Sequence, residues 1–424
     1  MRILMLAQFY PPIVGGEERL VQDLSRDLAR RGHDVAVATL LHDQLPRFEV
    51  DQGVQIYRIP STARRAAWLF SEPDRRHAPP WPDPETVAAL RQVVRQHRAE
   101  IVHAHNWLLY SFLPLKSAGK ARLVVTLHDY SLVCAVKRLM RHGRQCSGSQ
   151  LLKCMRCTSD YYGSVKGLPI LAGNWLMSAA ERAAVDMFLP ISHSVAQGNN
   201  LVGGRWPFQV IPNFVPDTLG APQPFEPAYA AQLPPDGYLL FVGDLTADKG
   251  IEVLLQAYAG LENVPPLVLI GRRHASQPLS LPPNVMVLDS WPHAAVMEAW
   301  RRCSLALAPS VWAEPFGLVA LEAMAVGCPV IASRAGGLSD IVVDGDTGLL
   351  VPPGDVSALR AAMTRLIASP ELRERMGQAG QHRVSEFRAS VVVPRVEQVY
   401  RALLGQQDEM VGQSSLAPVD RRVL

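Results

Sequence analysis

The stretch from Pro309 to Gly337 constrains the fold more than any other part of this 424-residue chain. The apolar run before it, Leu305 to Ala308, is typical of a short buried strand, and the segment Leu318 to Val326 has the length and composition of a helix. Gly327 and the proline two positions later end that helix, and a further apolar, β-branched run follows. This order of strand, loop, helix and strand predicts one repeat of an open α/β sheet.

Two glutamates in this stretch, Glu314 and Glu322, are the first candidates for a functional role. Glu314 lies in the loop after the strand, and ligands of open α/β sheets gather at the carboxyl ends of strands. Glu322 lies about one turn into the predicted helix, where a carboxylate needs solvent or donors such as the two hydroxyls of a ribose. A solvated glutamate near a helix N-terminus is the alternative. The backbone N–H groups that open the helix, from Gly317, Leu318 and Val319, would suit a phosphate.

The same alternation of strands and helices runs through the rest of the chain in two halves. Strands are predicted at residues 2–8, 34–40, 54–59, 101–105, 123–127, 187–191 and 208–211, and then at 238–242, 267–270 and 285–288. A proline-rich segment between the halves predicts a linker. We therefore predict an α/β protein of two Rossmann-like, doubly wound domains that face a central cleft, the default binding site.

The predicted boundaries follow from these patterns. The N-terminal, acceptor-side domain spans residues 1–212, with a cysteine-containing insertion at about 130–165, and the linker spans 213–237. The C-terminal, donor-binding domain spans 238–388. A last helix at 389–404 is expected to pack back toward the N-terminal domain, and 405–424 is expected to be a flexible tail.

Composition and charge narrow the function classes. No apolar run approaches the length of a membrane span and the N-terminus enters a strand directly, so we expect a cytoplasmic protein. Net charge is +9 over residues 1–215 and −6 over the rest. Two basic clusters could face an anionic acceptor or the inner membrane face, with a solvated basic face as an equal alternative: Arg64, Arg65, Arg75 and Arg76, and Lys137, Arg138, Arg141 and Arg144. The basic groups are not interleaved with stacking aromatic residues, so we expect no nucleic-acid partner.

Polar residues follow predicted strands in both halves. Gly15 and Gly16 follow the first strand, where a phosphate would approach the first helix, although a glycine pair alone is a weak signal. His128 follows another strand and could hydrogen-bond near a reacting carbon; a capping or core histidine is the alternative. Lys249 follows a strand and a polar turn, where it could neutralise a diphosphate or be a surface lysine. Arg272, after the next strand, is an alternative phosphate ligand.

Further histidines and cysteines favour structural roles. His103 and His105 alternate along a predicted strand, and we expect at most one of them to face the site. Four cysteines lie within one polar, basic segment of the first half: Cys134, Cys146, Cys154 and Cys157. Four thiolates can form a tetrahedral structural zinc site, and free or redox-active thiols are an equal alternative.

The segment EPFGLVALEAMAVGCPVIAS, with the later GGLSDIV and DGDTGLLV, resembles the signature of the family 4 retaining glycosyltransferases, which have the GT-B fold. The similarity covers nearly the whole chain, from the loop QFYPPIVGGEE to the final helix. It implies metal-independent transfer of a hexose from a nucleoside diphosphate sugar, such as a UDP or GDP sugar, to a hydroxyl acceptor with retention at the anomeric carbon. Such acceptors belong to polysaccharide, glycolipid or small-molecule glycoside synthesis. No cofactor is implied for catalysis.

The resemblance also implies roles for individual residues. Glu314 would bind the hydroxyls of the donor sugar, and His128 would lie beside the anomeric carbon. Glu322 would hold the ribose diol and Lys249 would neutralise the diphosphate. The remaining donor-binding residues are Gly15, Gly16, Phe316, Gly317, Leu318 and Val319. In the route usually proposed for the family, the departing phosphate itself takes the acceptor proton, so stabilising the departing charge is the main task.

One position departs from the family pattern. Family members usually have an arginine five positions before the lysine, and this chain has Asp244 there. A carboxylate cannot pair with a diphosphate, so either Arg272 or Arg273 substitutes or donor handling is altered. The alternatives to a transferase are a nucleotide-sugar epimerase or hydrolase of the same architecture, and a non-catalytic protein that binds sugar nucleotides.

Overall fold

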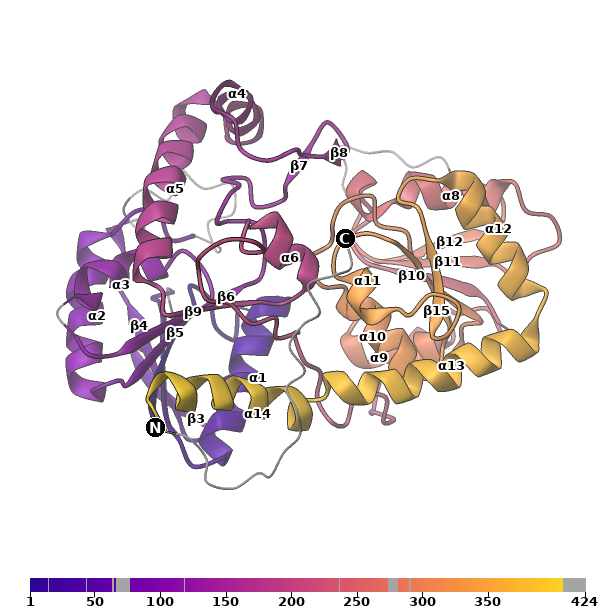
Figure 1. Cartoon of the computed structure of the whole chain (residues 1–424). Helices are drawn as coiled ribbons and strands as arrows, with labels where there is room; N and C mark the ends of the chain where they lie inside the picture. Colours follow the sequence, from indigo (N-terminus) through magenta and orange to yellow (C-terminus); the bar gives the residue numbers. More distant parts are fainter. Residues whose placement is uncertain are drawn as a thin grey trace.

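The computed structural model contains two parallel β-sheets with helices packed on them (Figure 1). It describes residues 1–13, 15–42, 44–62, 65, 77–117, 119–235, 237–273, 281–289 and 291–406. Within these ranges, both sheets have the order of doubly wound folds, in which the chain starts near the middle and moves outward in both directions. The two sheets are therefore two Rossmann-like domains.

The first sheet has the order β3-β4-β2-β1-β5-β6-β9 and is parallel except for β3. Its strands are β1 (Arg2–Leu6), β2 (Asp34–Leu40), β3 (Phe48–Asp51), β4 (Val54–Ile59), β5 (Ile101–Ala104), β6 (Arg122–Leu127) and β9 (Met187–Pro190). Its helices are α1 (Gly16–Arg30), α2 (Pro84–His97), α3 (Leu109–Lys116), α5 (Ser164–Ala184) and α6 (His193–Gly198). Between β6 and α5 the chain forms the hairpin β7 (Met140–Arg141) and β8 (Arg144–Gln145) and the helix α4 (Leu151–Tyr162).

The second sheet has the order β12-β11-β10-β13-β14-β15. Its strands are β10 (Leu239–Val242), β11 (Leu267–Ile270), β12 (Val285–Leu288), β13 (Leu305–Ala308), β14 (Val330–Ser333) and β15 (Gly348–Val351). Its helices are α8 (Ile251–Ala259), α9 (His293–Arg302), α10 (Leu318–Ala325), α11 (Leu338–Ile341), α12 (Val356–Ile367) and α13 (Pro370–Val384). Shorter elements are α7 (Pro227–Ala230) in the linker and the 3-10 turns η2 (Ala247–Lys249) and η3 (Ser385–Phe387).

The strands are apolar throughout because both faces of each sheet are covered. In β1, Leu4 and Leu6 join the apolar cluster that includes α2 and α3, while Ile3 and Met5 join a second cluster with α1. Successive side chains of a strand point to opposite faces, so a strand between two layers needs an unbroken apolar sequence. This is why short apolar runs, rather than alternating ones, predicted most of the strands.

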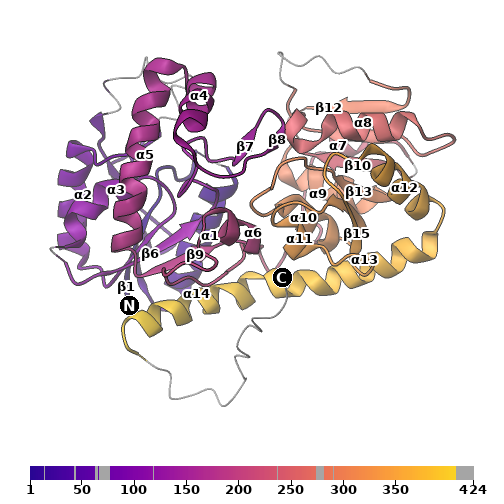
Figure 2. The same cartoon turned by 45° about the horizontal axis from the view of Figure 1, so that its top comes forward.

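The last helix, α14 (Ala389–Leu403), returns from the second domain to the first. Figures 1 and 2 show α13 along the second domain and α14 continuing along the first. Val392, Val393 and Tyr400 of α14 are buried in the same cluster as Ile3 and Leu24. The helix is also held by Glu397, which accepts a hydrogen bond from Arg31 at 2.8 Å. The two domains are thus joined by this helix as well as by the linker.

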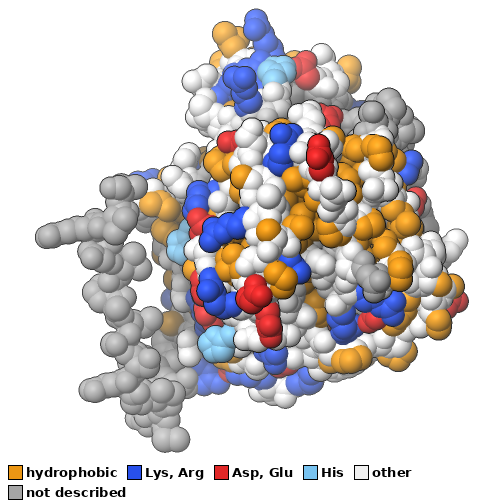
Figure 3. All heavy atoms as spheres, turned by 90° about the vertical axis from the view of Figure 1, so that its right-hand side faces the viewer, with side chains coloured by type: hydrophobic (Ala, Val, Ile, Leu, Met, Phe, Trp, Pro, Cys, Tyr) orange, Lys and Arg blue, Asp and Glu red, His pale blue; other side chains and the backbone are white. Residues whose placement is uncertain are grey.

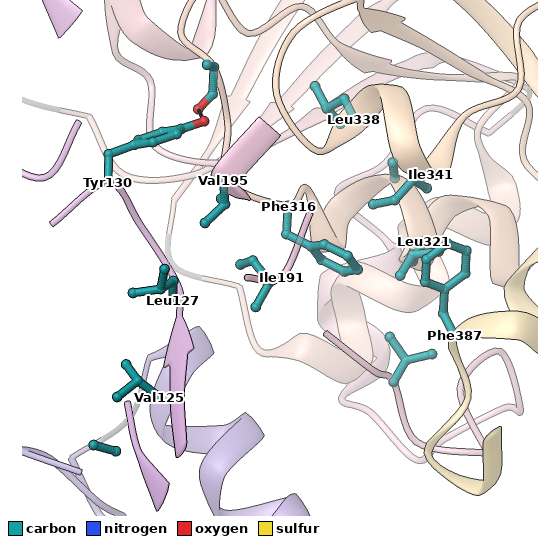
Figure 4. Close-up of a cluster of buried hydrophobic side chains, with 14 of the residues drawn as sticks. Val125, Leu127, Tyr130, Ile191, Val195, Phe316, Leu321, Leu338, Ile341 and Phe387 are labelled. Carbon is teal, nitrogen blue, oxygen red and sulfur yellow. Dashed lines mark hydrogen bonds between the residues drawn. The ribbon is translucent and has the colours of Figure 1, made fainter. Parts of the chain in front are cut away.

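Apolar packing is continuous between the domains. Figure 4 shows Leu127, Ile191 and Val195 of the first domain near Phe316 and Leu321 of the second. Two hydrogen bonds cross the same junction: the Tyr130 hydroxyl donates to the Ala313 carbonyl at 2.8 Å, and the Ser192 hydroxyl donates to the Pro315 carbonyl at 2.7 Å. The loop that carries Glu314 is therefore fixed by both domains.

Two local differences from the sequence-based expectation have clear causes. The strand expected at 208–211 is only an isolated bridge between Phe208 and Phe188 of β9. Pro190 in β9 has no N–H to donate, so a full ladder cannot form there. The antiparallel edge strand β3 was not predicted, because its side chains are only half-buried or exposed and Phe48 is 50% exposed.

Candidate active site

Glu314 is held rigidly at the carboxyl end of β13. Its carboxylate accepts hydrogen bonds from the Lys249 ammonium at 2.5 Å and from the Ser310 hydroxyl at 2.7 Å. Gly336 packs against the same loop so closely that a Cβ atom on it would lie 2.0 Å from the Glu314 carbonyl oxygen. Only glycine permits this approach, so the glycine pair after β14 keeps the Glu314 loop in place. The structure thus brings Glu314 and Lys249, 65 positions apart in the sequence, into one ion pair.

The N-terminus of α10 is free of side-chain capping. Its N-cap residue, Gly317, has φ of 107°, a conformation that favours glycine, and no side chain caps the helix. Leu318 and Val319 are the first helical residues, as expected, so their backbone N–H groups lack helical acceptors. Gly16, at the N-terminus of α1, lies against this point: a Cβ atom on it would be 3.9 Å from the Leu318 side chain. The N-termini of α1 and α10, one from each domain, therefore meet.

Glu322 has a partner that the sequence analysis missed. The His293 Nε2 atom lies 3.0 Å from the Glu322 carboxylate, and His293 is the first residue of α9. The hydrogen bond to Glu322 raises the pKa of His293, in opposition to partial burial. No spacing rule links the two residues in sequence, because the contact depends on how α9 and α10 pack. Glu322 is therefore a paired carboxylate at the cleft rather than a solvated one.

Asp244 also has a partner. The Arg272 guanidinium donates to both carboxylate oxygens of Asp244, at 3.1 and 3.3 Å. The carboxylate is thus paired with a cation that follows the neighbouring strand β11. The structure brings Arg272 to the position next to Asp244, where the family pattern has an arginine in the chain itself.

His128 belongs to a buried row of rings in the first domain. Its Nε2 atom lies 3.0 Å from Nδ1 of His105, whose ring lies tilted against that of His103 at 4.3 Å between centroids. His103 in turn bonds through Nδ1 to the Tyr400 hydroxyl at 2.6 Å and through Nε2 to the Thr126 hydroxyl at 2.7 Å. The row therefore runs from the cleft to the returning helix α14.

The expectation that at most one of His103 and His105 faces the site was wrong in its premise. Residues two positions apart in a strand share one face of the sheet, so the two rings lie side by side. His105 binds His128 directly, and His103 is one ring further from the cleft. Both histidines therefore belong to the same polar row, although neither was assigned a role.

All three histidines are neutral at pH 7. Burial lowers the pKa of His128 to about 4 and that of His103 to about 3, and burial also holds the pKa of His105 well below its usual range. The His105 Nε2 atom is buried and has no hydrogen-bond partner among the described residues. An unpaired buried acceptor is less costly than an unpaired N–H, so we place the His105 proton on Nδ1, where it donates to His128. His128 is then left with its proton on Nδ1.

The Phe316 side chain is buried in the apolar core and does not line an open pocket. Its ring is 3% exposed and packs edge-on against Phe387 at 6.1 Å between centroids (Figure 4). Its side chain therefore fixes the loop between Glu314 and Gly317 by packing in the apolar core. The sequence could not show this, because an aromatic residue next to a glycine is compatible with either placement.

The four cysteines of the insertion converge on one cavity of about 20 Å³. All four thiols are free in the structure. Burial raises the pKa of Cys134 and of Cys157. In the ranges that the structure describes, however, no group of three or more His, Cys, Asp and Glu side chains is arranged to hold a metal ion. The thiols fit zinc chemically, but their arrangement here does not form its ligand set.

Of the first basic cluster named above, only Arg65 lies within the described residues. Arg64, Arg75 and Arg76 lie outside the described residues, and Arg65 forms an ion pair with Glu85 on α2. Among the described helices, none is long and apolar enough to cross a membrane.

Comparison with known proteins identifies the family. Residues 14–219 match the model described as Glycosyltransferase Family 4, and residues 230–383 match the model described as Glycosyl transferases group 1. The chain is a glycosyltransferase with a family 4 domain and a group 1 domain. The two matched regions of this glycosyltransferase correspond to its two sheets, with the boundary in the proline-rich linker.

Curated relatives align with the glycosyltransferase over almost its whole length. It is 28% identical to a glycogen synthase of Mycobacterium tuberculosis, over 95% of each chain. It is 26% identical to a D-inositol 3-phosphate glycosyltransferase of Corynebacterium diphtheriae, over 94% of each chain. The protein is therefore an enzyme of the glycosyltransferase class.

Solved structures show the GT-B fold. A sucrose-phosphate synthase of Thermosynechococcus elongatus superimposes with a TM-score of 0.72 at 22% identity, covering 96% of this chain and 99% of the other. Anabaena HepE, solved in complex with UDP, superimposes with a TM-score of 0.66 at 18% identity, covering 95% and 100%. The expectation of a GT-B glycosyltransferase is confirmed.

Proposed function

We propose that this glycosyltransferase transfers a sugar from a nucleoside diphosphate sugar to a hydroxyl acceptor with retention at the anomeric carbon. The observation that carries the proposal is the Lys249–Glu314 ion pair beside the uncapped N-terminus of α10. A cation and free backbone N–H groups suit a diphosphate, and a carboxylate suits sugar hydroxyls. Structures of Anabaena HepE with UDP and with UDP-glucose, at 18% identity, support a donor of this kind.

The donor would lie along the second domain. Glu322 would accept hydrogen bonds from the ribose diol, with His293 holding its carboxylate in place. The N–H groups of Leu318 and Val319, with Lys249 and the Gly15 and Gly16 backbone across the cleft, would bind the diphosphate. Arg272 is held next to Asp244 and would add positive charge at the edge of the site. Glu314 would hold the transferred sugar once the donor draws Lys249 toward its phosphates.

The first domain would supply neutral contacts at the reacting carbon. His128 Nδ1–H would donate to a sugar hydroxyl near the anomeric carbon, because its Nε2 atom is occupied by His105. As the bond from C1 to the phosphate oxygen breaks, its electron pair leaves with that oxygen. The acceptor oxygen forms the new bond to C1 on the same face, and its proton passes to the departing phosphate oxygen. The protein's main task is then to stabilise the negative charge on that phosphate.

A donor panel tests this function. The protein is incubated with UDP and GDP sugars and a set of hydroxyl acceptors, and the anomeric configuration of the product is determined by NMR. A product with the donor's configuration supports the proposal, and an inverted product contradicts it. Release of free sugar or of an epimerised nucleotide sugar would indicate a hydrolase or an epimerase, and nucleotide binding without turnover would indicate a binding protein. Retained activity in the presence of a chelator is expected, since Lys249 and the helix N-terminus meet the phosphate charge.

We also propose that the insertion docks on an anionic membrane surface that carries the acceptor. Apolar side chains are exposed on α4 and α5: Val165 is 86% exposed, and Leu152 and Leu176 are each 72% exposed. Lys137 and Arg138 are engaged elsewhere, over the Trp107 ring and with Asp248, but between residues 141 and 166 stand five lysine and arginine residues and a single acidic one, Asp160. The region projects from the molecule where α4 is drawn in Figure 1, and the tip of this projection is rich in blue and pale blue side chains in Figure 3. Exposed apolar groups beside basic ones fit an interface of anionic lipid.

Vesicle sedimentation tests the docking proposal. We expect binding to vesicles that contain phosphatidylserine at low salt, weaker binding at high salt, and little binding to pure phosphatidylcholine. Replacing Leu152 and Val165 with serine should reduce binding without altering turnover of a water-soluble acceptor. Absence of binding to anionic vesicles at low salt would contradict the proposal, and a dimer that dissociates in the same variant would show that a second copy covers this surface.

The zinc prediction for the four cysteines stays a prediction. Elemental analysis of protein purified under reducing conditions measures it directly. One zinc per chain would require the thiols to rearrange around the cavity that they line. Protein without zinc would leave four free thiols, as the structure shows them.

A further inference from the structure

Glu17 is a carboxyl group at the cleft that none of the roles above uses. It lies in the first turn of α1, directly after Gly16, on which a Cβ atom would lie 3.9 Å from the Leu318 side chain of the second domain. Glu17 is half-buried. Glu17 thus stands where the two domains approach each other, beside the proposed diphosphate site.

The Glu17 carboxylate is held from one side only. Asn106 Nδ2 donates to its Oε1 atom at 2.7 Å, the one hydrogen bond to this side chain in the described part of the chain. The orientation of the Asn106 amide is fixed, because its Oδ1 atom accepts from the backbone N–H groups of Gln8 and Leu108, each at 3.2 Å. An Asn106 that accepts from both N–H groups must present its NH₂ group to Glu17.

This holding residue also links Glu17 to the histidine row. Asn106 directly follows His105, which binds His128, so a single turn of chain after β5 positions both His128 and Glu17. The two side chains come from different elements, yet they are fixed by neighbouring residues. Such shared support is expected where two groups act on one substrate.

The surroundings of Glu17 keep the pKa of its carboxyl group near neutral pH. Burial raises the pKa of Glu17 to about 7, and the neighbouring charges of Glu18 and Asp129 act in the same direction. The hydrogen bond from Asn106 and the charge of Lys137 oppose this rise. No cation forms an ion pair with Glu17 in the described residues, so its second oxygen is available to a hydroxyl donor.

We propose that Glu17 binds the acceptor hydroxyl and orients its oxygen toward the anomeric carbon. This inference rests on the proposed function and deepens it, because it assigns the acceptor side of the reaction. The ionised carboxylate accepts a hydrogen bond from the hydroxyl while the acceptor oxygen forms its bond to C1. The C1–phosphate bond breaks with its electron pair on the phosphate oxygen, which takes the acceptor proton. Glu17 is unchanged at the end of the step.

Glu17→Gln tests the assignment, since glutamine keeps the shape of the side chain but removes its charge. We expect kcat/KM for the acceptor to fall roughly 10- to 100-fold, the effect of one hydrogen bond to a charged group, while UDP or GDP binding in calorimetry stays unchanged. In the wild type, the rate should rise with pH through about 7 as Glu17 ionises, and this rise should disappear in Glu17→Gln. Glu252→Gln is the matched control, because Glu252 is an exposed glutamate in the first turn of α8.

A second measurement needs no activity. A carboxyl with a raised pKa in the folded state binds its proton more tightly than in the unfolded chain, so its contribution to stability is lost as pH rises through about 7. Between pH 5 and 8 the melting temperature of the wild type should therefore fall relative to that of Glu17→Gln. Parallel melting curves, or wild-type rate and pH profile in Glu17→Gln, would overturn the assignment. Nucleotide binding without transfer in the wild type would instead refute the proposed function, and the acceptor role with it.

Discussion

The two halves of the proposed active site differ in their electrostatics. In the second domain, the Glu314 and Glu322 carboxylates are paired with the basic side chains of Lys249 and His293. In the first domain, His128 and its neighbour His105 are neutral, because burial holds their pKa values low. In the proposed reaction, the donor half would meet a diphosphate with charge, and the other half would meet the reacting carbon with neutral hydrogen-bond donors.

The difference follows from where each half lies. Lys249 and His293 are partly exposed, so a positive charge on either side chain is in contact with solvent as well as with its carboxylate partner. The histidine row lies within the core between β5, β6 and α14, where a charged ring would be strongly destabilised. A charged side chain is therefore tolerated on the donor side, whereas burial keeps the rings on the other side neutral.

The largest loss of activity is expected when one residue from either half is replaced. Glu314→Ala removes the carboxylate for the donor sugar, and His128→Ala removes the proposed contact near the anomeric carbon. Each should lower kcat by roughly 10²- to 10³-fold, as does the loss of one preorganised group at a reacting centre. Steady-state kinetics with the donor identified by the panel measures both, and circular dichroism checks the fold. Near-normal turnover in either variant would show that the substituted residue takes no part in transfer, and would contradict the assignment of that half of the site.

Lys249→Ala should have the next largest effect. Removing the ammonium eliminates a charge-assisted contact with the diphosphate, and the affinity for UDP or GDP should fall roughly 10- to 100-fold. Isothermal titration calorimetry measures this loss. Lys249→Arg serves as the control, because it keeps the charge on a longer side chain. Unchanged nucleotide affinity in Lys249→Ala would contradict the phosphate role and leave Lys249 only as a partner of Glu314.

Removing the partner of Glu322 should have a smaller effect. In His293→Ala the carboxylate keeps its charge but loses its hydrogen bond, so the affinity for the nucleoside diphosphate should fall about 3- to 10-fold. The pKa of His293 is raised by Glu322, so the wild-type affinity should also weaken as pH rises and His293 loses its proton. Fluorescence or calorimetric titrations from pH 6 to 8.5 measure both. A pH-independent difference between wild type and variant would mean that His293 acts by packing alone.

Tyr400→Phe should have the smallest effect on catalysis. The change removes one hydroxyl and leaves Nδ1 of the buried His103 without its partner, which should lower the free energy of unfolding by about 1–3 kcal/mol. If the row also positions His128, kcat should fall a few-fold while KM for the donor stays constant. Val399→Ala, a buried change on the same helix, is the control for stability. Equal losses of kcat at matched stability in the two variants would show that Tyr400 has only a structural role.

Local sequence patterns determined much of this protein. Unbroken apolar runs predicted both sheets, because a parallel strand covered on both faces has no polar side. The glycine and proline residues around α10 marked its ends, since they select backbone conformations that few other residues adopt. For the same reason the loop of Glu314 and the N-terminus of α10 could be proposed as a candidate ligand site from the sequence.

Only the tertiary structure decided which residues meet. His103 and Tyr400 are 297 positions apart, and Asn106 and Glu17 are 89 apart, so no local pattern could pair them. The same holds for His293 with Glu322, and for Arg272 with Asp244. Such contacts depend on the packing of whole helices and strands, and the pKa values that follow depend on burial. The chain's sequence thus determined its elements and its chemically suited residues, while packing between distant segments decided their partners and their charge.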